Sequence, residues 1–248
     1  MAKFDIGKTL KKTISDAGTA TKKAAEAVAD TAKEIKIPDI DKEKVKNVFK
    51  KKEKPAEETV QPVVNHRISA WNAMKVFYYL MAADGAIHPD EMEKFDSMGK
   101  EFVPDFLNVK EKLIQECQAA LDNVIDAEDY YDVLQDCVEN ALLAPGKKED
   151  AYISPKFLIW DLLTIAYSDD SYDETERRLL KYIVRKLNID KAVFLELESS
   201  LVTLMDLEKE LAWIKTTDRP YLTIEAMVNE IADRRNVIFE SVKDLITL

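Results

Sequence analysis

The sequence predicts an all-α protein: a pseudo-symmetric helical bundle preceded by a basic amphipathic helix and a flexible linker. Only 5 of the 248 residues are glycine and 33% are charged, which favours helices over a sheet with many tight turns. Apolar residues recur at helical spacing along most of the chain. An acidic turn between two such helical patterns occurs twice, and this duplication predicts two related halves.

The two copies of the acidic turn match in the placing of their carboxylates. The first copy covers residues 81–91 and the second covers residues 166–176. When Asp84 is aligned with Asp169, an offset of 85 residues, Glu91 falls on Glu176. Each copy follows an apolar helical pattern and precedes a charged amphipathic one. The duplication therefore predicts a pseudo-symmetric bundle with an acidic site.

Charge is distributed unevenly along the chain. Residues 1–64 contain 15 Lys and 11 Asp or Glu, a net charge of +4, which leaves −15 for the remainder because the whole chain carries −11. An acidic body disfavours nucleic acid as a partner, since phosphates require a basic surface. It suits a soluble protein or one that attracts cations.

Cysteine and histidine are too few for several kinds of site. Cys117 and Cys137 have no CxxC spacing, so we expect two buried thiols in a reducing cytosol. With only His66 and His88, imidazole-rich metal sites and Ser-His-Asp chemistry are nearly excluded. No run of 18 apolar residues and no apolar signal region occurs, so we expect a cytoplasmic protein.

Residues 1–54 read as a basic amphipathic helical region and residues 55–64 as a linker. The apolar face begins with Phe4, Ile6, Leu10 and Ile14. Lysines flank it at positions 8, 11, 12, 22, 23, 33 and 36. We expect the four apolar residues to enter an anionic membrane surface. The alternative is a solubilising tail that reaches a protein partner.

The first half of the predicted helical domain (residues 65–248) covers about residues 68–145. A helix opens at Ser69, and Gly85 is placed to cap it in the left-handed conformation. Pro89 begins the next helix and Pro104 closes it. Two further helices are predicted near residues 108–121 and 126–143.

The second half, about residues 152–248, follows the same plan. Ser154 caps its first helix, and Asp173 with Glu176 forms a capping box for the next. Two more helices are predicted near residues 191–214 and 223–247. Residues 152–153 and 221–222 are at most short extended pieces.

The metal hypothesis concerns Asp84, Glu91, Asp169 and Glu176. Two acids seven residues apart can converge across a turn, and carboxylates suit calcium or magnesium. The alternative is that Asp84 and Asp169 only end helices while the two glutamates only close capping boxes. Neither turn has the ligand spacing of an EF-hand. We expect His88 to be an exposed cap.

Asp161 lies in an otherwise apolar helical pattern, from Phe157 to Ile165. A carboxylate there needs a partner or lies at the edge of the stripe. Arg177–Arg178 or Arg234–Arg235 could supply the partner. Aromatic residues at helical spacing are expected in the core: Trp71, Phe77, Tyr78, Tyr79, Tyr130, Tyr131 and Trp160.

The chain contains no GxSxG, P-loop, GxGxxG or HExxH motif. We therefore expect no enzymatic activity.

The residues from Ala82 to Glu91 form an apolar helix end, then Asp84-Gly85, a small apolar pair and a glutamate. This turn, and its second copy from Ser168 to Glu176, resembles that of the tellurite-resistance TerB-like family. In the second copy, Asp170 stands at the place of Gly85. The resemblance covers residues 68–248 and implies an all-helical fold with pseudo-symmetric halves and a bacterial origin. It also implies an acidic metal site and a part in stress and metal-resistance systems, often near membranes.

The leading hypothesis is a non-enzymatic bacterial module of the stress and metal-resistance type, with an acidic site for a divalent cation. The alternative is a membrane-surface adaptor or scaffold that uses residues 1–54. Both readings imply protein partners, and the second implies a peripheral position on the inner face of the membrane.

Overall fold

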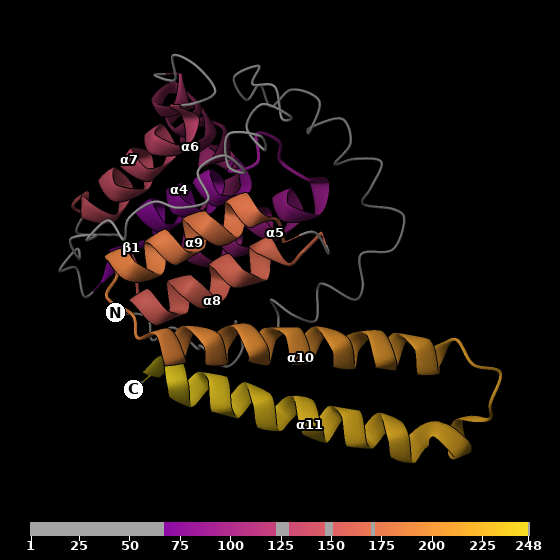
Figure 1. Cartoon of the computed structure of the whole chain (residues 1–248). Helices are drawn as coiled ribbons and strands as arrows, with labels where there is room; N and C mark the ends of the chain where they lie inside the picture. Colours follow the sequence, from indigo (N-terminus) through magenta and orange to yellow (C-terminus); the bar gives the residue numbers. More distant parts are fainter. Residues whose placement is uncertain (1–66, 123–128, 147–150, 170–171, 248) are drawn as a thin grey trace. The chain divides into compact units, whose positions relative to one another are not determined.

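The computed structural model describes residues 67–122, 129–146, 151–169 and 172–247 (Figure 1). The predictions for residues 1–54, for the linker 55–64 and for Asp170 lie outside these ranges. Within them the chain forms eight helices and two strands of two residues each, so the predicted all-α class is confirmed.

The first helix–turn–helix begins with β1 (Ile68–Ser69) and continues into α4 (Ala70–Met81) and α5 (Pro89–Phe102). Ser69 caps α4, since its hydroxyl accepts a hydrogen bond from the Asn72 N–H at 3.3 Å. Gly85 has the positive φ expected of it, 85°. It does not cap α4, however, because the cap residue is Ala82. Gly85 instead turns the chain three residues later, where its N–H donates to the Ala82 carbonyl at 3.0 Å.

The second helix–turn–helix repeats the first at the same offset. It consists of β2 (Tyr152–Ile153), α8 (Pro155–Ala166) and α9 (Glu174–Lys186). Helices α4 and α8 both have 12 residues. Their N-caps, Ser69 and Ser154, stand 85 residues apart, like the N-caps of α5 and α9. The wider division into halves 68–145 and 152–248 stays a prediction.

Helix α4 is central to the unit formed by residues 67–190. It packs against α5, α8 and α9, and against α6 (Phe106–Leu121) and α7 (Tyr130–Leu143). Ten residues of α4 and ten of α8 are buried, which explains their nearly continuous apolar sequences. The pair β1–β2 joins the two repeats, with Ile68 opposite Ile153 in antiparallel register.

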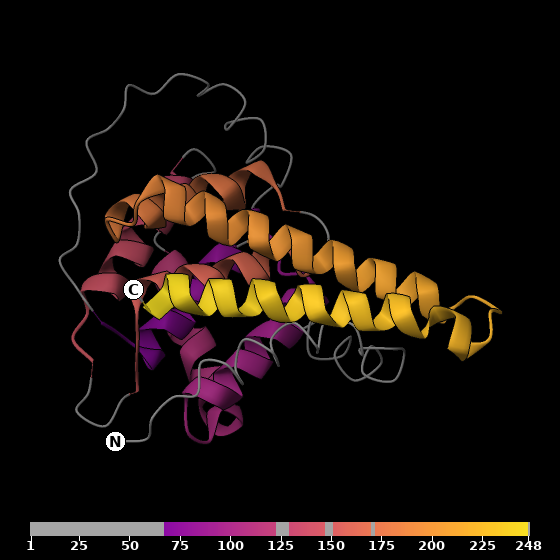
Figure 2. The same cartoon turned by 90° about the horizontal axis from the view of Figure 1, so that it is seen from below.

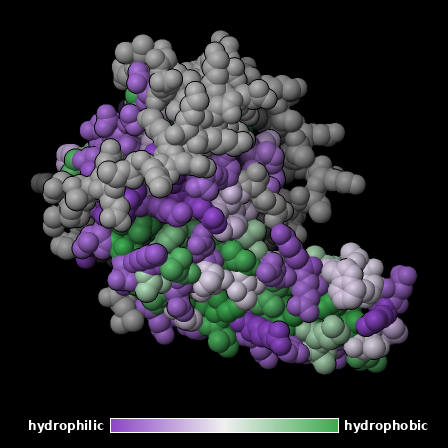
Figure 3. Space-filling model, viewed as in Figure 1, coloured by the Kyte–Doolittle hydropathy of each residue, from purple (hydrophilic) through white to green (hydrophobic). Residues whose placement is uncertain are grey.

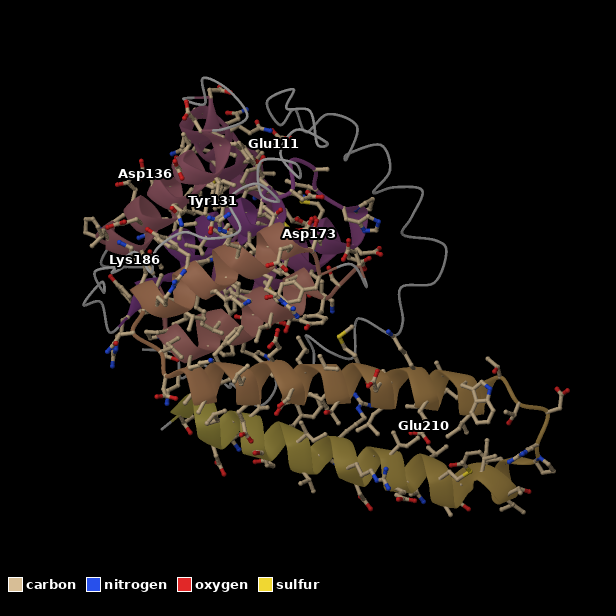
Figure 4. The ribbon with its side chains drawn as sticks, viewed as in Figure 1. Glu111, Tyr131, Asp136, Asp173, Lys186 and Glu210 are labelled. Atoms are coloured by element: carbon tan, nitrogen blue, oxygen red, sulfur yellow. The ribbon has the colours of Figure 1, made fainter. Side chains whose placement is uncertain are left out.

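Helices α7 and α9 are joined by polar contacts as well as by packing. The Lys186 ammonium lies 2.7 Å from a Glu139 carboxylate oxygen, and the Tyr182 hydroxyl donates to the same oxygen at 3.1 Å. Figure 4 shows Lys186 at the carboxyl end of α9. These contacts fix α9, which carries part of the acidic site described below.

The remaining helices, α10 (Lys191–Lys215) and α11 (Tyr221–Thr247), form a second compact unit. They run side by side as a hairpin (Figures 1 and 2). Apolar residues hold the two helices together: Leu207, Ile214, Ile224 and Ile231, with Leu211, Val228 and Ile238 packed against them. The extended piece predicted at Tyr221–Leu222 is wrong, because these residues begin α11 after Pro220. The boundary between units, after Asp190, lies inside the predicted domain 65–248.

Candidate acidic site in two matching turns

The first turn, between α4 and α5, is held by three polar contacts. A carboxylate oxygen of Asp84 accepts a hydrogen bond from the Ala86 N–H at 2.9 Å. His88 caps α5 through its Nδ1, which accepts from the Asp90 N–H at 3.3 Å, and its side chain is about half exposed. Glu91 accepts from the His88 N–H at 2.7 Å and closes the capping box. The expectation that His88 is an exposed cap is confirmed.

The second turn, between α8 and α9, has the same chemistry with a stronger cap. Asp173, at the amino end of α9 (Figure 4), accepts from the N–H groups of Thr175 at 2.6 Å and Glu176 at 3.1 Å. Glu176 accepts from the Asp173 N–H at 2.9 Å. The predicted capping box of Asp173 and Glu176 is confirmed.

The two glutamates that close these boxes are buried. Glu91 is 4% exposed and Glu176 is 7% exposed. Burial raises the pKa of Glu91 to about 9, although the His88 N–H acts in the opposite direction. Burial likewise raises the pKa of Glu176 to about 8 against the stabilising N–H of Asp173.

Negative charges from both turns act on each glutamate. The carboxylates of Glu176, Asp169 and Asp84 add to the pKa rise of Glu91. Asp173, Asp169 and Asp84 do the same for Glu176. The charges of Asp84 and Asp169 thus act on both Glu91 and Glu176, which together are the four residues that the sequence singled out. Because like charges meet where water is scarce, the site binds protons more tightly than ordinary carboxylates do.

The chemistry of this donor set limits which metal it suits. The four side chains offer only carboxylate oxygens, which hard cations such as calcium and magnesium prefer. Among the described residues, however, no three His, Cys, Asp or Glu side chains are grouped so that they could hold a metal ion. One oxygen of each glutamate is also engaged by a backbone N–H. In the part of the chain that the structure describes, the arrangement therefore does not form a closed chelate.

Aromatic and arginine side chains flank the second turn, and sequence reasoning missed this feature. The rings of Tyr167 and Tyr172 lie 4.6 Å apart, and the Arg177 guanidinium lies 5.0 Å from the Tyr172 ring centre. Two tyrosines on either side of Asp169 were the available signal. Arg178 lies 4.6 Å from the ring centre of Tyr131 on α7. Arginine and tyrosine side chains thus lie next to the second acidic turn.

Asp161 has none of the partners expected for it. It is fully buried in α8, not at the edge of the stripe, and neither carboxyl oxygen has a hydrogen-bond partner among the described residues. Arg177 and Arg178 contact tyrosine rings, while Arg234 pairs with Glu230 and Arg235 with Glu208. Burial, followed by the charge of Glu101, holds the pKa of Asp161 well above its usual range.

The predicted membrane-contact residues Phe4, Ile6, Leu10 and Ile14 lie outside the described ranges. Among the helices that the structure does describe, none combines the length and apolarity that a membrane span needs.

The turn–helix repeat and its acidic site can be compared with known families. The family model described as tellurite resistance protein TerB matches residues 70–198, just over half of the chain. The chain belongs to the TerB family. The TerB match contains α4 to α9 with both acidic turns, and it ends inside α10. No curated protein and no solved structure matched the chain. Most of the α10–α11 hairpin therefore lies beyond the TerB match.

Proposed function

We propose that this TerB-family protein is a non-enzymatic bacterial module of the stress and metal-resistance type, whose acidic site takes up a divalent cation weakly. The observation that carries the proposal is the mutual effect of the carboxylates of the two turns on the pKa values of Glu91 and Glu176. A cation among them would offset this repulsion and replace the protons that the two glutamates otherwise hold.

The proposal assigns the acids to binding and not to catalysis. Both glutamates are fixed by backbone N–H groups at the start of their helices. The sequence offers no nucleophile motif and no phosphate-binding loop to accompany them. A site of this kind senses or buffers a cation. Binding would change the charge at the first turns of α5 and α9, which contain Glu91 and Glu176.

Titration calorimetry with calcium and with magnesium tests the cation site. The wild-type chain should release or absorb heat with weak, saturable binding, and Asp84→Asn/Asp169→Asn should not. The asparagine at position 84 can still accept from the Ala86 N–H, so the turn is retained. The matched control is Asp206→Asn/Asp218→Asn, which removes the same charge from two exposed positions in the other unit. Absence of heat in the wild type means that the acids serve only as helix caps.

The second candidate function is a membrane-surface adaptor in the cytoplasm, and a different observation favours it. Residues 1–64 carry +4 while the rest carries −15, and lysines flank the apolar face that begins at Phe4. Each lysine near an anionic surface contributes about 1 kcal/mol of binding free energy. In this reading the N-terminal segment binds lipid and the TerB domain recruits a protein partner.

Circular dichroism of a peptide of residues 1–54 with neutral and anionic vesicles tests the adaptor function. Helix gained only on anionic vesicles, and lost at high salt, supports it. An unchanged spectrum on both surfaces eliminates it and leaves the solubilising tail.

A further inference from the structure

We infer that the α10–α11 hairpin carries a docking groove for the chain's own N-terminal segment, with Ile6, Leu10 and Ile14 as the apolar anchors. This inference does not depend on the cation site. It starts from the surface of the hairpin and from the charge and length of residues 1–66.

The groove lies between the two helices of the hairpin and has a volume of about 420 Å³. Its apolar lining residues are Leu207 and Ile238, which belong to the hairpin's apolar contacts, and Val237, which is 71% exposed. Thr203, Glu230, Asp233 and Arg234 complete the lining. Figure 3 shows apolar residues among hydrophilic ones on the surface formed by α10 and α11.

An amphipathic helix is the occupant whose spacing fits this groove. Along α11 the lining runs from Glu230 to Ile238, nine residues that extend over about 12 Å of helix. Ile6, Leu10 and Ile14 are four residues apart, so on a helix they lie on one face and also extend over about 12 Å. Helices that bind in grooves use such anchors.

Charge complementarity favours the N-terminal segment over a second copy of the hairpin. Residues 191–248 contain 7 Lys or Arg and 11 Asp or Glu, a net charge of −4, whereas residues 1–54 carry +6 from 15 Lys and 9 acids. At the groove, Arg234 is paired with Glu230 at 2.5 Å, and Asp233 is exposed beside them. Lys8, Lys11 and Lys12, which are close to the predicted anchors in sequence, add to the positive charge of the segment. Two hairpins would instead repel each other.

The chain between the anchors and the folded body is long enough to allow docking. The 28 residues from Asp39 to His66 can extend over as much as about 90 Å. Helix α11, with 27 residues, is about 40 Å long. The fully extended linker is thus longer than the hairpin.

The test uses the full chain with a nitroxide attached at Lys12→Cys and methyl NMR of valine, leucine and isoleucine. Cys117 and Cys137 are buried, so the introduced thiol is the accessible one. The nitroxide should broaden the Val237 and Ile238 methyl signals, which should return when it is reduced. The methyl signals of Leu222, which lies 15 residues before Val237 on α11, should remain sharp.

Two substitutions at exposed positions of α11 complete the test. Val237→Asn should abolish the broadening at Ile238, whereas Leu222→Asn, at a position that is 86% exposed, should preserve it. Neither side chain belongs to the core, so both variants should fold. Absence of broadening, or broadening that persists in Val237→Asn, overturns the inference. Broadening seen only between a spin-labelled chain and a separate isotope-labelled chain also overturns it, because the occupant would then be a second copy.

Discussion

Glu91 and Glu176 each close a capping box, and each is also a buried acid among other acids. An exposed capping glutamate would keep an ordinary pKa, whereas these two are raised to about 9 and about 8. In the folded chain each therefore holds a proton at a pH where the unfolded chain has released it. The contribution of these two glutamates to folding stability is therefore greatest below the ordinary glutamate pKa, and it is lost as the pH rises toward their raised values.

Glu91→Gln should reduce this pH dependence. Glutamine can still accept the hydrogen bond from the His88 N–H, so the capping box is retained. The free energy of unfolding of the wild type should fall between about pH 6 and pH 8, and the variant should lose up to about 1.4 kcal/mol less per pH unit. Urea unfolding at each pH measures the difference. Glu210→Gln, on the exposed surface of α10 (Figure 4), is the control and should match the wild type.

Asp161→Leu should stabilise the protein. A buried carboxyl without a partner costs about 1–3 kcal/mol, and leucine removes that cost. Because the pKa of Asp161 is held well above its usual range, the gain should increase as the pH rises. Urea unfolding measures both effects.

Thr164→Val is the control for Asp161→Leu. Thr164 is buried one turn later in α8, but its hydroxyl donates to the Trp160 carbonyl at 2.9 Å, so its replacement should bring no gain. A loss of stability in Asp161→Leu would mean that the carboxyl has a partner or that leucine does not fit.

The two capping boxes differ in strength at the level of the helix. Asp173 accepts from two N–H groups of α9, whereas His88 accepts from one N–H of α5 at 3.3 Å. Removing the Asp173 cap should therefore lower the free energy of unfolding more than removing the His88 cap. The Asp173 cap also fixes the start of α9, and therefore the position of Glu176 in the acidic site.

Asp173→Ala should lower the free energy of unfolding by about 0.5–2 kcal/mol, and His88→Ala by less. Asp173→Asn, which keeps a side-chain acceptor, should remain close to the wild type. Denaturant unfolding of the three variants checks the order. Equal losses in Asp173→Ala and Asp173→Asn would mean that the charge, not the acceptor, stabilises α9.

The caps could be predicted from sequence because they depend on local spacing: Asp173 and Glu176 are three residues apart. The 85-residue offset predicted two matching turns, but it did not predict that the carboxylates of one turn act on the glutamate of the other. The burial of Glu91 was not predicted either, because it depends on how α5 packs. The sequence did not show that Asp161 lacks a partner, because the contacts of the four arginines depend on tertiary packing. In the structure these arginines contact other residues. The position of Gly85 was missed because its glycine signal fixes the left-handed conformation but not the last helical residue.

At the scale of the whole molecule, the basic N-terminal segment has two proposed binding surfaces, a membrane and the hairpin groove. One apolar face cannot occupy both at once, so docking would reduce membrane binding. Both interactions depend on the positive charge of residues 1–64, so high salt should weaken the binding of the segment to the membrane and to the groove.

Val237→Asn in the full chain should therefore bind anionic vesicles more strongly than the wild type does. Leu222→Asn should bind like the wild type, because Leu222 does not line the groove. Sedimentation with anionic and neutral vesicles measures the bound fraction. If the wild type and Val237→Asn bind equally, docking and membrane binding do not compete.

The convergence of the two acidic turns is tested most directly by NMR titration of the glutamate side-chain carboxyls in the wild type and in Asp169→Asn. Glu91 should titrate near pH 9 in the wild type and at a lower pH in the variant, because the charge of Asp169 in the second turn adds to the rise at Glu91 in the first. Asp206→Asn should leave the titration unchanged. An ordinary pKa for Glu91, or one that does not respond to Asp169→Asn, would contradict a shared acidic site.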